Sequence, residues 1–385
     1  MRVLVVHNRY RSENPSGENA VVDLEVDLLR GAGVDVAVFE RSSDEIDAFS
    51  RRERAGLAMQ PIYSASSIRR VREIVREFKP DVLHLHNPYP LISPSVLRAA
   101  HAAGVATVVT VHNYRLMCAN GLFFRDGHSC HDCQDTRLPY PAVVHACYRE
   151  SRPESAVIGT ALVVHRKTWH TVDRFIALSD PIRDFLLAYG IPVQRIALKP
   201  NTVRDPGPPM PVGSGFLFAG RLSVEKGIEI LIEAWNRHPV GSLGILRICG
   251  DGELRGRVEA WAAGRADVDF KGQCSEEAVS QLVDEAAVVV IPSTWEEPFG
   301  LVAVEAMAHG RPVLASDRGA LPELVGDDGG WVVNADADSW ATGLVSASAV
   351  TAENAASARR RYEREFAPPA NVAALLSAYR TAQGR

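Results

Sequence analysis

The chain lacks a long uncharged apolar run, an excess of positive charge and an internal repeat. No apolar run approaches the roughly 18 residues that a membrane-spanning helix needs, which argues against an integral membrane protein. The formal net charge of −5 argues against nucleic acid as the main partner. Disorder is also excluded, because 46% of the residues are hydrophobic and only 23% are charged. No repeat at solenoid spacing is present.

The N-terminal apolar stretch is short. It runs from Met1 to Val6, and polar residues follow at once, so we expect no secretory signal and a cytoplasmic protein. A chain of 385 residues has room for two ordinary domains, each with its own core.

Strand and helix signals alternate along the chain, which predicts an α/β protein with parallel sheets. The expected helices include Glu18–Leu29 and Ile68–Phe78. The expected strands of the first half are Val3–Val6, Val34–Phe39, Val82–Leu85, Val105–Val111, Phe175–Leu178 and Ile196–Leu198. Those of the second half lie near Phe216, Leu246, Val268, Val288, Val313 and Trp331.

A proline-rich segment, Asp205–Pro211, divides the two halves and predicts a linker. We therefore expect an N-terminal domain over residues 1–200 and a C-terminal domain over 201–365. The tail from Thr351 is predicted to be helical, with a break at Pro368 and Pro369. Residues 366–385 would form a last helix.

The stretch from Glu297 to Glu305 is the most informative part of the sequence. A buried strand ends near Ile291, and Pro298 is tolerated only at or before a first helical turn. The free amides of Phe299, Gly300 and Leu301 would then point out of a strand-to-helix turn, which suits an anion. Glu297 lies before the helix and Glu305 inside it. A nucleoside diphosphate sugar, with hydroxyl groups on both sides of a diphosphate, would satisfy this arrangement.

Three other predicted strands end in loops of the same kind. Gly220-Arg221-Leu222 leads to Lys226 and Gly227, two cations in a glycine-bounded turn that can grip a diphosphate. Gly250-Asp251-Gly252 follows the next strand, and Lys271-Gly272 ends the third. Ligands of open parallel sheets bind at the carboxyl ends of the strands.

These motifs resemble those of glycosyltransferase family 4, whose members are retaining enzymes with the two-domain GT-B fold. The resemblance is carried by Gly-Arg-Leu-x(3)-Lys-Gly, Gly-Asp-Gly and Glu-Pro-Phe-Gly-Leu-x(3)-Glu-Ala-Met-Ala, roughly from Gly215 to Val333. The first half matches more loosely, through Ser16-Gly17-Glu18 and Thr110-Val111-His112. Ser16 departs from the family, which has glycine there. The resemblance implies two Rossmann-like domains with a cleft between them and a last helix that returns to the first domain.

The resemblance also implies roles for individual residues. Glu305 would bind the ribose hydroxyls, Glu297 the donor sugar, and Arg221 and Lys226 the leaving diphosphate. His112 would be an active-site residue that contacts the donor sugar. The implied donor-binding set comprises Gly17, Arg221, Lys226, Gly250, Gly252, Lys271, Glu297, Phe299, Gly300, Leu301 and Glu305. No catalytic metal is expected, because the two cations would do its work.

Four of the six cysteines are clustered: Cys118, Cys130, Cys133 and Cys147. They lie in the segment 112–150, which shows little regular periodicity and is long for a loop without support. Thiols stay reduced in the cytosol, so a structural zinc site is the first hypothesis. Unmetallated thiols and disulfides are the alternatives.

The predicted function is transfer of a sugar from a nucleoside diphosphate sugar to a hydroxyl of a glycan, a lipid-linked sugar or a small molecule. A GT-B-fold epimerase or phosphorylase is one alternative, and a non-catalytic nucleotide-sugar-binding subunit is another. Many relatives dock on membranes through a basic surface of the first domain. Here Glu73 and Glu77 interrupt the basic series from Arg69 to Arg76, which favours an ordinary solvated face over peripheral contact with the inner membrane face. Oligomeric state is not predicted.

Overall fold

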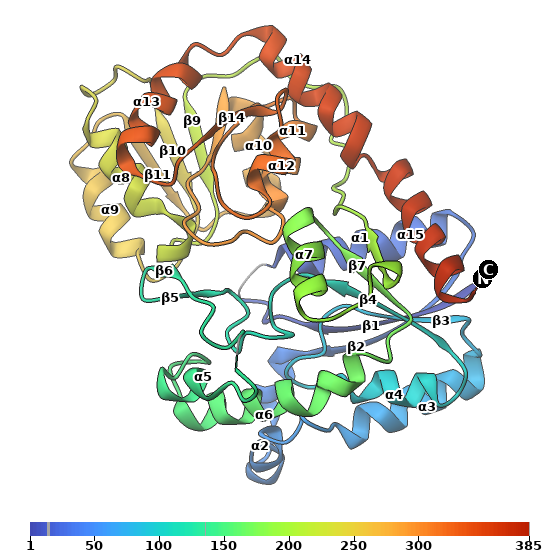
Figure 1. The fold of residues 1–385 in the computed structure, drawn as a ribbon. Helices are drawn as coiled ribbons and strands as arrows, with labels where there is room; N and C mark the ends of the chain where they lie inside the picture. The colour runs from blue at the N-terminus through green and yellow to red at the C-terminus, as the bar shows by residue number, and fades with distance from the viewer. Residues whose placement is uncertain (14–15, 135, 385) are drawn as a thin grey trace. The chain divides into compact units, whose positions relative to one another are not determined.

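The computed structural model describes residues 1–13, 16–134 and 136–384. The chain divides into two compact units, coloured along the sequence in Figure 1. Unit 1 comprises Met1–Phe123, Cys130–Asn201 and Pro369–Arg385. Unit 2 comprises Phe124–Ser129 and Thr202–Pro368.

Unit 1 is built on a parallel sheet of six strands in its described part, in the order β2-β1-β3-β4-β7-β8. The strands are β1 (Arg2–Arg9), β2 (Asp35–Ser42), β3 (Val82–Leu85), β4 (Ala106–Val111), β7 (Arg174–Ala177) and β8 (Ile196–Leu198). Because side chains alternate along a strand, β1 contributes to both faces of the sheet. Leu4 and Val6 join one buried cluster, and Val3 and Val5 join another.

Helices cover both faces of this sheet. On one face, apolar residues of α1 and α15 pack with Val3 and Val5, and on the other, residues of α3, α4 and α7 pack with Leu4 and Val6. The helices of unit 1 are α1 (Gly17–Gly31), α2 (Arg51–Leu57), α3 (Ala65–Phe78), α4 (Ser95–His101), α5 (Tyr140–Val144), α6 (Arg152–Trp169), α7 (Asp180–Ala188) and α15 (Pro368–Ala382). The first and last helices of the chain therefore share one core.

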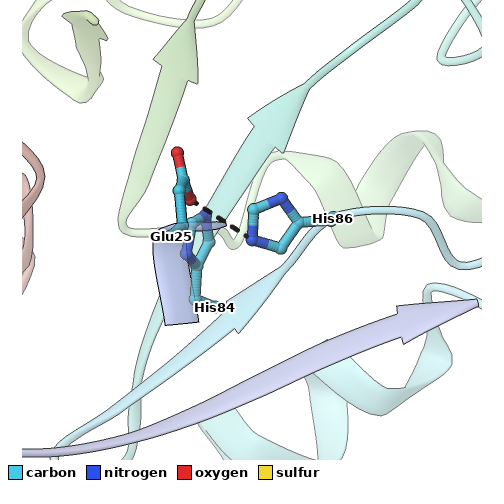
Figure 2. A group of neighbouring side chains, drawn as sticks. All are labelled: Glu25, His84 and His86. Carbon is cyan, nitrogen blue, oxygen red and sulfur yellow. Dashed lines mark ion pairs between the residues drawn. The ribbon is translucent and has the colours of Figure 1, made fainter. Parts of the chain in front are cut away.

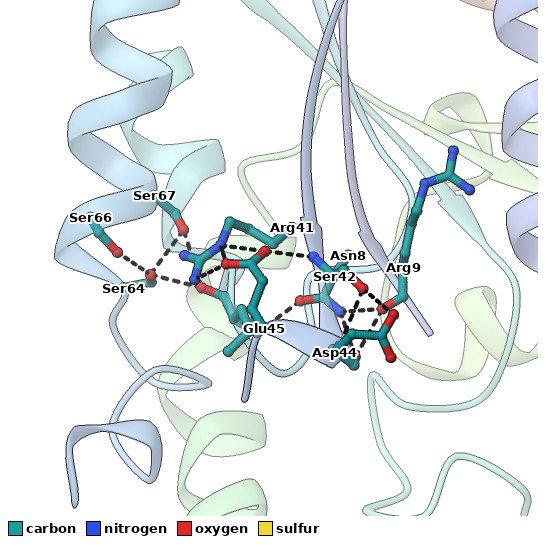
Figure 3. A network of polar contacts seen from close by, with 11 residues as sticks. Asn8, Arg9, Arg41, Ser42, Asp44, Glu45, Ser64, Ser66 and Ser67 are labelled. Carbon is teal, nitrogen blue, oxygen red and sulfur yellow. Dashed lines mark hydrogen bonds and ion pairs between the residues drawn. The ribbon is translucent and has the colours of Figure 1, made fainter. Parts of the chain in front are cut away.

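Strands β1 and β2 continue beyond their predicted ends. Register pairs run on from His7↔Glu40 to Arg9↔Ser42. A polar network fixes this end of the sheet (Figure 3). The side-chain amide of Asn8 donates to Ser43 Oγ at 3.1 Å. Its side-chain oxygen, Oδ1, accepts from the backbone amide of Leu91 at 3.0 Å. Asn8 thus holds the strand end in place.

Unit 2 has a second parallel sheet of six described strands, in the order β11-β10-β9-β12-β13-β14. These are β9 (Phe216–Ala219), β10 (Leu246–Cys249), β11 (Val268–Gly272), β12 (Val288–Ile291), β13 (Val313–Ser316) and β14 (Gly330–Val333). The helices are α8 (Ile228–Asn236), α9 (Arg255–Ala263), α10 (Glu276–Glu285), α11 (Leu301–Ala308), α12 (Leu321–Val325), α13 (Ala337–Ser348) and α14 (Ala352–Arg361). The antiparallel hairpin of β5 (Phe124–Arg125) and β6 (His128–Ser129) is grouped with this unit.

The C-terminal segment breaks where two prolines occur. A π-helical turn, Tyr362–Phe366, continues α14, and Ala367 then adopts an extended conformation. Pro368 opens α15, since proline is tolerated in a first helical turn. In the described part of the chain, none of the helices combines the length and apolar character that crossing a membrane requires.

Candidate functional site

Two of the predicted ligand loops lie side by side because β9 and β12 are neighbours in the sheet of unit 2. Gly227, with φ of 71°, passes so close to the second loop that a Cβ there would lie 1.7 Å from the carbonyl oxygen of Pro292. The amide of Thr294 donates to the carbonyl of Glu225 at 2.9 Å. The backbone thus joins the Arg221–Gly227 loop to the segment that carries Glu297.

Lys226 and Glu297 form the centre of this site. The ammonium group lies 3.0 and 2.9 Å from the two carboxylate oxygens of Glu297. Oε2 also accepts from Ser293 Oγ and from Trp295 Nε1, each at 2.9 Å. Glu297 is only 6% exposed, so these donors compensate the cost of burying its charge. Lys226 also lies 5.1 Å from the centroid of the Trp295 ring.

Arg221 is more accessible than Lys226. Its side chain is 58% exposed and lies 3.1 Å from the buried carboxylate of Glu225. A guanidinium group held at one side by a carboxylate keeps its other N–H donors available for an incoming anion.

In the Gly250-Asp251-Gly252 loop, both glycines are required by close packing against the backbone of a neighbouring loop. A Cβ on Gly250 would lie 1.9 Å from the carbonyl oxygen of Gly220, and one on Gly252 would lie 2.4 Å from that of Leu222. The amide of Leu222 donates to Asp251 O at 2.8 Å. The two loops therefore pack backbone to backbone, which accounts for both glycines without a ligand. Lys271 pairs with Asp269 at 2.8 Å on edge strand β11.

Helix α11 begins at Leu301 and has the left-handed Gly300 as its N-cap, with φ of 103° and no side-chain capping bond. Phe299 is buried and its ring packs near that of Phe366. Glu305 lies one turn into the helix and is half-buried. Burial, with the nearby charge of Glu276, raises the pKa of Glu305 to about 7. A hydrogen-bonding partner that favours the ionised form would lower that pKa again.

In unit 1, His112 follows the end of β4 and belongs to a buried polar chain. Its Nε2 lies 3.0 Å from His86 Nδ1. His86 Nε2 lies 3.7 Å from Glu25, and the opposite oxygen of Glu25 accepts from Lys199 Nζ at 2.5 Å. Asn371 of α15 also accepts from Lys199, at 3.1 Å. We call this set, from His112 through His86 and Glu25 to Lys199, the buried polar chain.

Glu25, His84 and His86 each offer one potential metal-ligand atom, and these three atoms all lie within 4.8 Å of one another (Figure 2). This spacing would suit a metal ion, but the Lys199 ammonium already neutralises Glu25. His84 uses both ring nitrogens, one with Tyr379 and one with Thr110, each at 2.8 Å. These residues are therefore explained as a buried ion pair with neutral histidines beside it.

Burial keeps these histidines neutral. It lowers the pKa of His84 to about 3, and it lowers the pKa values of His86 and His112 well below their ordinary value. Neutral His112 donates one hydrogen bond from the ring nitrogen that carries the proton and accepts one at the other. If His86 carries its proton on the nitrogen facing Glu25, His112 donates to His86 and its Nδ1 is an acceptor.

His112 lines a cavity of about 30 Å³ together with Glu18, Arg115, Tyr89 and other residues of unit 1. Glu18 accepts from the hydroxyl of Tyr10 at 3.1 Å, and burial raises the pKa of Glu18 to about 7. Gly17 is the first residue of α1, and Ser16 is its N-cap without a side-chain capping bond.

Several of these residues were missed in the sequence. Ser293 and Trp295 were not recognised as the donors to Glu297, although both lie within four residues of it. Glu25, His84 and His86 were also missed, because their partners are far away along the chain. The spacing of the histidine pair, on alternate positions at a strand end, was the available signal.

Two family models match the chain. One, described as "Glycosyl transferase 4-like domain", matches residues 16–202, and the other, "Glycosyl transferases group 1", matches residues 213–349. An uncharacterized glycosyltransferase of Methanocaldococcus jannaschii is 41% identical over 33% of this chain and 34% of its own length. The phosphatidyl-myo-inositol mannosyltransferase of Mycobacterium leprae is 26% identical over 88% of this chain and 85% of its own length.

Solved structures share the fold over the whole chain. Sucrose-phosphate synthase from Thermosynechococcus elongatus has a TM-score of 0.72 at 20% identity, covering 98% of both chains. HepE of Anabaena, in complex with UDP, has a TM-score of 0.65 at 18% identity, covering 98% of this chain and 99% of that chain.

These matches confirm the predicted family and fold. The chain belongs to the family 4 glycosyltransferases, and its architecture is the GT-B fold. The chain spans half the length or less of the first curated relatives that it matches: 34% of the archaeal protein and 48% of a sulfoquinovosyl transferase of Arabidopsis thaliana.

Proposed function

We propose that this protein is a retaining glycosyltransferase that uses a nucleoside diphosphate sugar and needs no metal ion for the transfer. The observation that carries the proposal is the pairing of Lys226 with Glu297 across two loops at adjacent strand ends, with Arg221 and the uncapped start of α11 in the same loops. Cations and free helix amides together suit a diphosphate, and carboxylates suit sugar hydroxyls.

Each group has a defined part in this proposal. Arg221 and Lys226 stabilise the charge that develops on the leaving diphosphate. Glu305 accepts hydrogen bonds from the ribose hydroxyls, and Glu297 orients both Lys226 and the donor sugar. Neutral His112 is proposed to contact the donor sugar. None of the described carboxylates is placed by its contacts as a nucleophile, so we favour front-face attack assisted by the leaving diphosphate.

The relatives support a nucleotide-sugar donor without identifying it. Structures of HepE contain UDP or UDP-glucose, and a relative in Mycobacterium tuberculosis is described as GDP-mannose-dependent. The acceptor is proposed to be a hydroxyl of a glycan, a lipid-linked sugar or a small molecule. A GT-B-fold epimerase or phosphorylase, and a non-catalytic subunit, are the competing functions.

A panel of nucleotide sugars tests the proposal. The correct donor is expected to raise the melting temperature, because a ligand that binds only the folded protein stabilises it by mass action. Slow hydrolysis of that donor without acceptor is expected, and proton NMR of the released sugar should show the anomeric configuration of the donor. An inverted first-formed product would refute retention. Binding without any turnover, with a range of acceptors supplied, would favour the non-catalytic subunit.

Donor affinity is expected to depend on pH through Glu305. Hydrogen bonds from ribose favour the ionised carboxylate, so affinity is full above the pKa and is lost as pH falls through it. Since this pKa is about 7 before binding, we expect about tenfold weaker binding at pH 6 than at pH 8. Calorimetry measures this affinity at each pH. The ligand should be an intact nucleotide sugar, because the terminal phosphate of a nucleoside diphosphate would itself titrate.

Two variants sharpen the pH test. Glu305→Gln should weaken binding at pH 8 and flatten the profile. Glu276→Gln removes the like charge that helps to raise the pKa of Glu305, and it should move the profile toward lower pH. A wild-type profile that is flat between pH 6 and 8 would contradict the assignment of Glu305.

Metal independence has its own test. EDTA added to folded enzyme in a short assay is expected to leave the rate of transfer unchanged. Rapid loss of activity that manganese or magnesium restores would show that Arg221 and Lys226 do not suffice.

A further inference from the structure

The cavity of unit 1 is lined by buried polar atoms that have no hydrogen-bond partner in the part of the chain that the structure describes. These atoms are Glu18 Oε1, Tyr89 Oη, Arg115 Nε and Trp169 Nε1. Tyr89 and Trp169 are only 4% and 1% exposed, so bulk water does not compensate for the missing bonds. A buried donor or acceptor without a partner destabilises the folded protein. Four such side chains around one cavity therefore indicate a polar group that binds there.

The position of the cavity in the sheet favours a ligand over a purely structural role. In the strand order β2-β1-β3-β4, the chain leaves β1 in one direction and continues from β3 in the other. Glu18 lies in the first turn of α1, which follows β1, and Tyr89 lies in the loop that follows β3. The cavity therefore lies at the carboxyl ends of the two strands between which the order reverses. Open parallel sheets bind their ligands at such a point.

Contacts within unit 1 hold two of these side chains in place. The amide of Tyr89 donates to Asn87 Oδ1 at 3.0 Å, and Asn87 Nδ2 donates to the carbonyl of Asn8 at 2.9 Å. Glu18 Oε2 accepts from the hydroxyl of Tyr10 at 3.1 Å, which leaves Oε1 for another donor. A site whose groups are positioned in advance loses less conformational entropy when a ligand binds.

The charges and the size of the cavity define the chemistry of the ligand. Arg115 and Trp169 can only donate hydrogen bonds, the carboxylate of Glu18 accepts them, and the Tyr89 hydroxyl does both. An anion would be repelled by Glu18, and a cation by Arg115. A hydroxyl group both donates and accepts, so it suits the whole set. The volume of about 30 Å³ corresponds to roughly two water molecules, which is also the space of two neighbouring hydroxyl groups.

We propose that this cavity binds a pair of carbohydrate hydroxyl groups, with Glu18 and Tyr89 as specificity-determining residues. Glu18 accepts from one hydroxyl, while Tyr89 and Arg115 donate to the hydroxyl oxygens. The source of the carbohydrate rests on the proposed function, since either the donor sugar or the acceptor can supply these groups. A site of this kind discriminates strongly against a sugar that lacks the hydroxyl, because its buried polar groups then stay unpaired.

A binding measurement that does not use activity is the first test. A panel of methyl hexosides, which are neutral and hydroxylated, is titrated into the full chain and followed by saturation-transfer NMR. Tyr89→Phe is expected to weaken binding of the best hexoside roughly threefold to tenfold, because it removes one hydrogen-bonding group and keeps the ring. Glu18→Gln is expected to weaken it by about tenfold, because the lost acceptor is charged. Tyr189→Phe is the matched control and should leave the affinity unchanged, since this partly buried tyrosine of unit 1 lies outside the cavity lining.

The nucleotide sugar identified by the donor panel then distinguishes the two sources. If a saturating concentration displaces the hexoside, the cavity holds the donor sugar. If the hexoside still binds, the cavity holds the acceptor. Either result supports a hydroxyl site. Because hexoside binding needs no turnover, it can hold when the proposed transfer reaction fails, and it can fail when that reaction holds.

A crystal structure of the wild-type protein with the best-binding hexoside covers the case in which a variant fails to fold. Two of its hydroxyl oxygens are expected within hydrogen-bond distance of Glu18 and Tyr89. Ordered water alone in the cavity at saturating hexoside would overturn the proposal. So would a panel in which no hexoside binds, displacement of the hexoside by inorganic phosphate, or wild-type affinity in both Tyr89→Phe and Glu18→Gln.

Discussion

Replacing Lys226 with alanine is expected to lower turnover by about two to three orders of magnitude, the usual effect of losing one group that stabilises developing charge. Lys226 is the best-positioned cation of the proposed donor site, since Glu297, Ser293 and Trp295 fix its environment. Arg221→Ala is expected to have an effect of similar size. The loss should appear in turnover at saturating donor, because the charge on the leaving diphosphate develops only in the transition state.

The control for this experiment is Lys167→Ala. Lys167 is exposed near the end of α6, so its loss removes a positive charge without touching the loops of unit 2. Circular dichroism of each variant checks the fold. Turnover within a factor of two of wild type in both Lys226→Ala and Arg221→Ala would eliminate this donor site.

The second large effect is on stability. Lys199→Ala is expected to lower the free energy of unfolding of unit 1 by about 3–5 kcal/mol, because it leaves the carboxylate of Glu25 buried without its cation. The two side chains are 1% and 2% exposed and lie 2.5 Å apart. Hydrogen exchange of peptides from β1 and β3 measures the change within unit 1.

A double-mutant cycle separates the pair from its neighbours. Glu25→Gln with Lys199→Met removes both charges, so the double variant should be more stable than the two single effects added together predict. Arg70→Ala is the matched control, since Arg70 pairs with Glu73 at 3.2 Å on an exposed surface, where such a pair contributes about 0–1 kcal/mol. An equally small effect of Lys199→Ala would show that the ammonium does not compensate Glu25.

Much of the fold was predictable because apolar runs and turn residues mark parallel strands. Val82–Leu85 and Ile196–Leu198 coincide with β3 and β8. Prediction stopped too early at β1 and β2, where pairing continues through polar residues such as Glu40 and Arg41. Hydrophobicity locates the buried part of a strand, whereas hydrogen-bonded register determines its length.

The candidate site was predictable where its residues are close in sequence. Glu297 and Gly300 stand in one motif. The structure adds that Gly300 has the left-handed conformation that only glycine takes easily. Gly250 and Gly252 illustrate the opposite case. A glycine motif indicates that a ligand or another chain segment approaches the backbone closely. Here the neighbouring loop is close enough to require both glycines. Sequence alone does not separate a ligand from a neighbouring chain segment.

The buried polar chain was beyond sequence reasoning for a different reason. Lys199 lies 174 residues from Glu25 and 172 from Asn371. Each is an ordinary polar residue in its own segment. Only the folded topology, which packs α1 and α15 on one face of the sheet whose edge strand is β8, makes them a unit.

Helix α15 also has a consequence for the order in which the protein is made. Tyr379 contacts His84, and Asn371 contacts Lys199, so unit 1 is synthesised first but completed last. Between Asn201 and Pro369 the ribosome must build the main segment of unit 2. At ordinary elongation rates this takes roughly 8 to 33 seconds. During that time the nascent unit 1 carries an open apolar face where α15 will pack, together with Lys199 deprived of one acceptor. Synthesis of unit 2 is therefore complete before unit 1 receives its last helix.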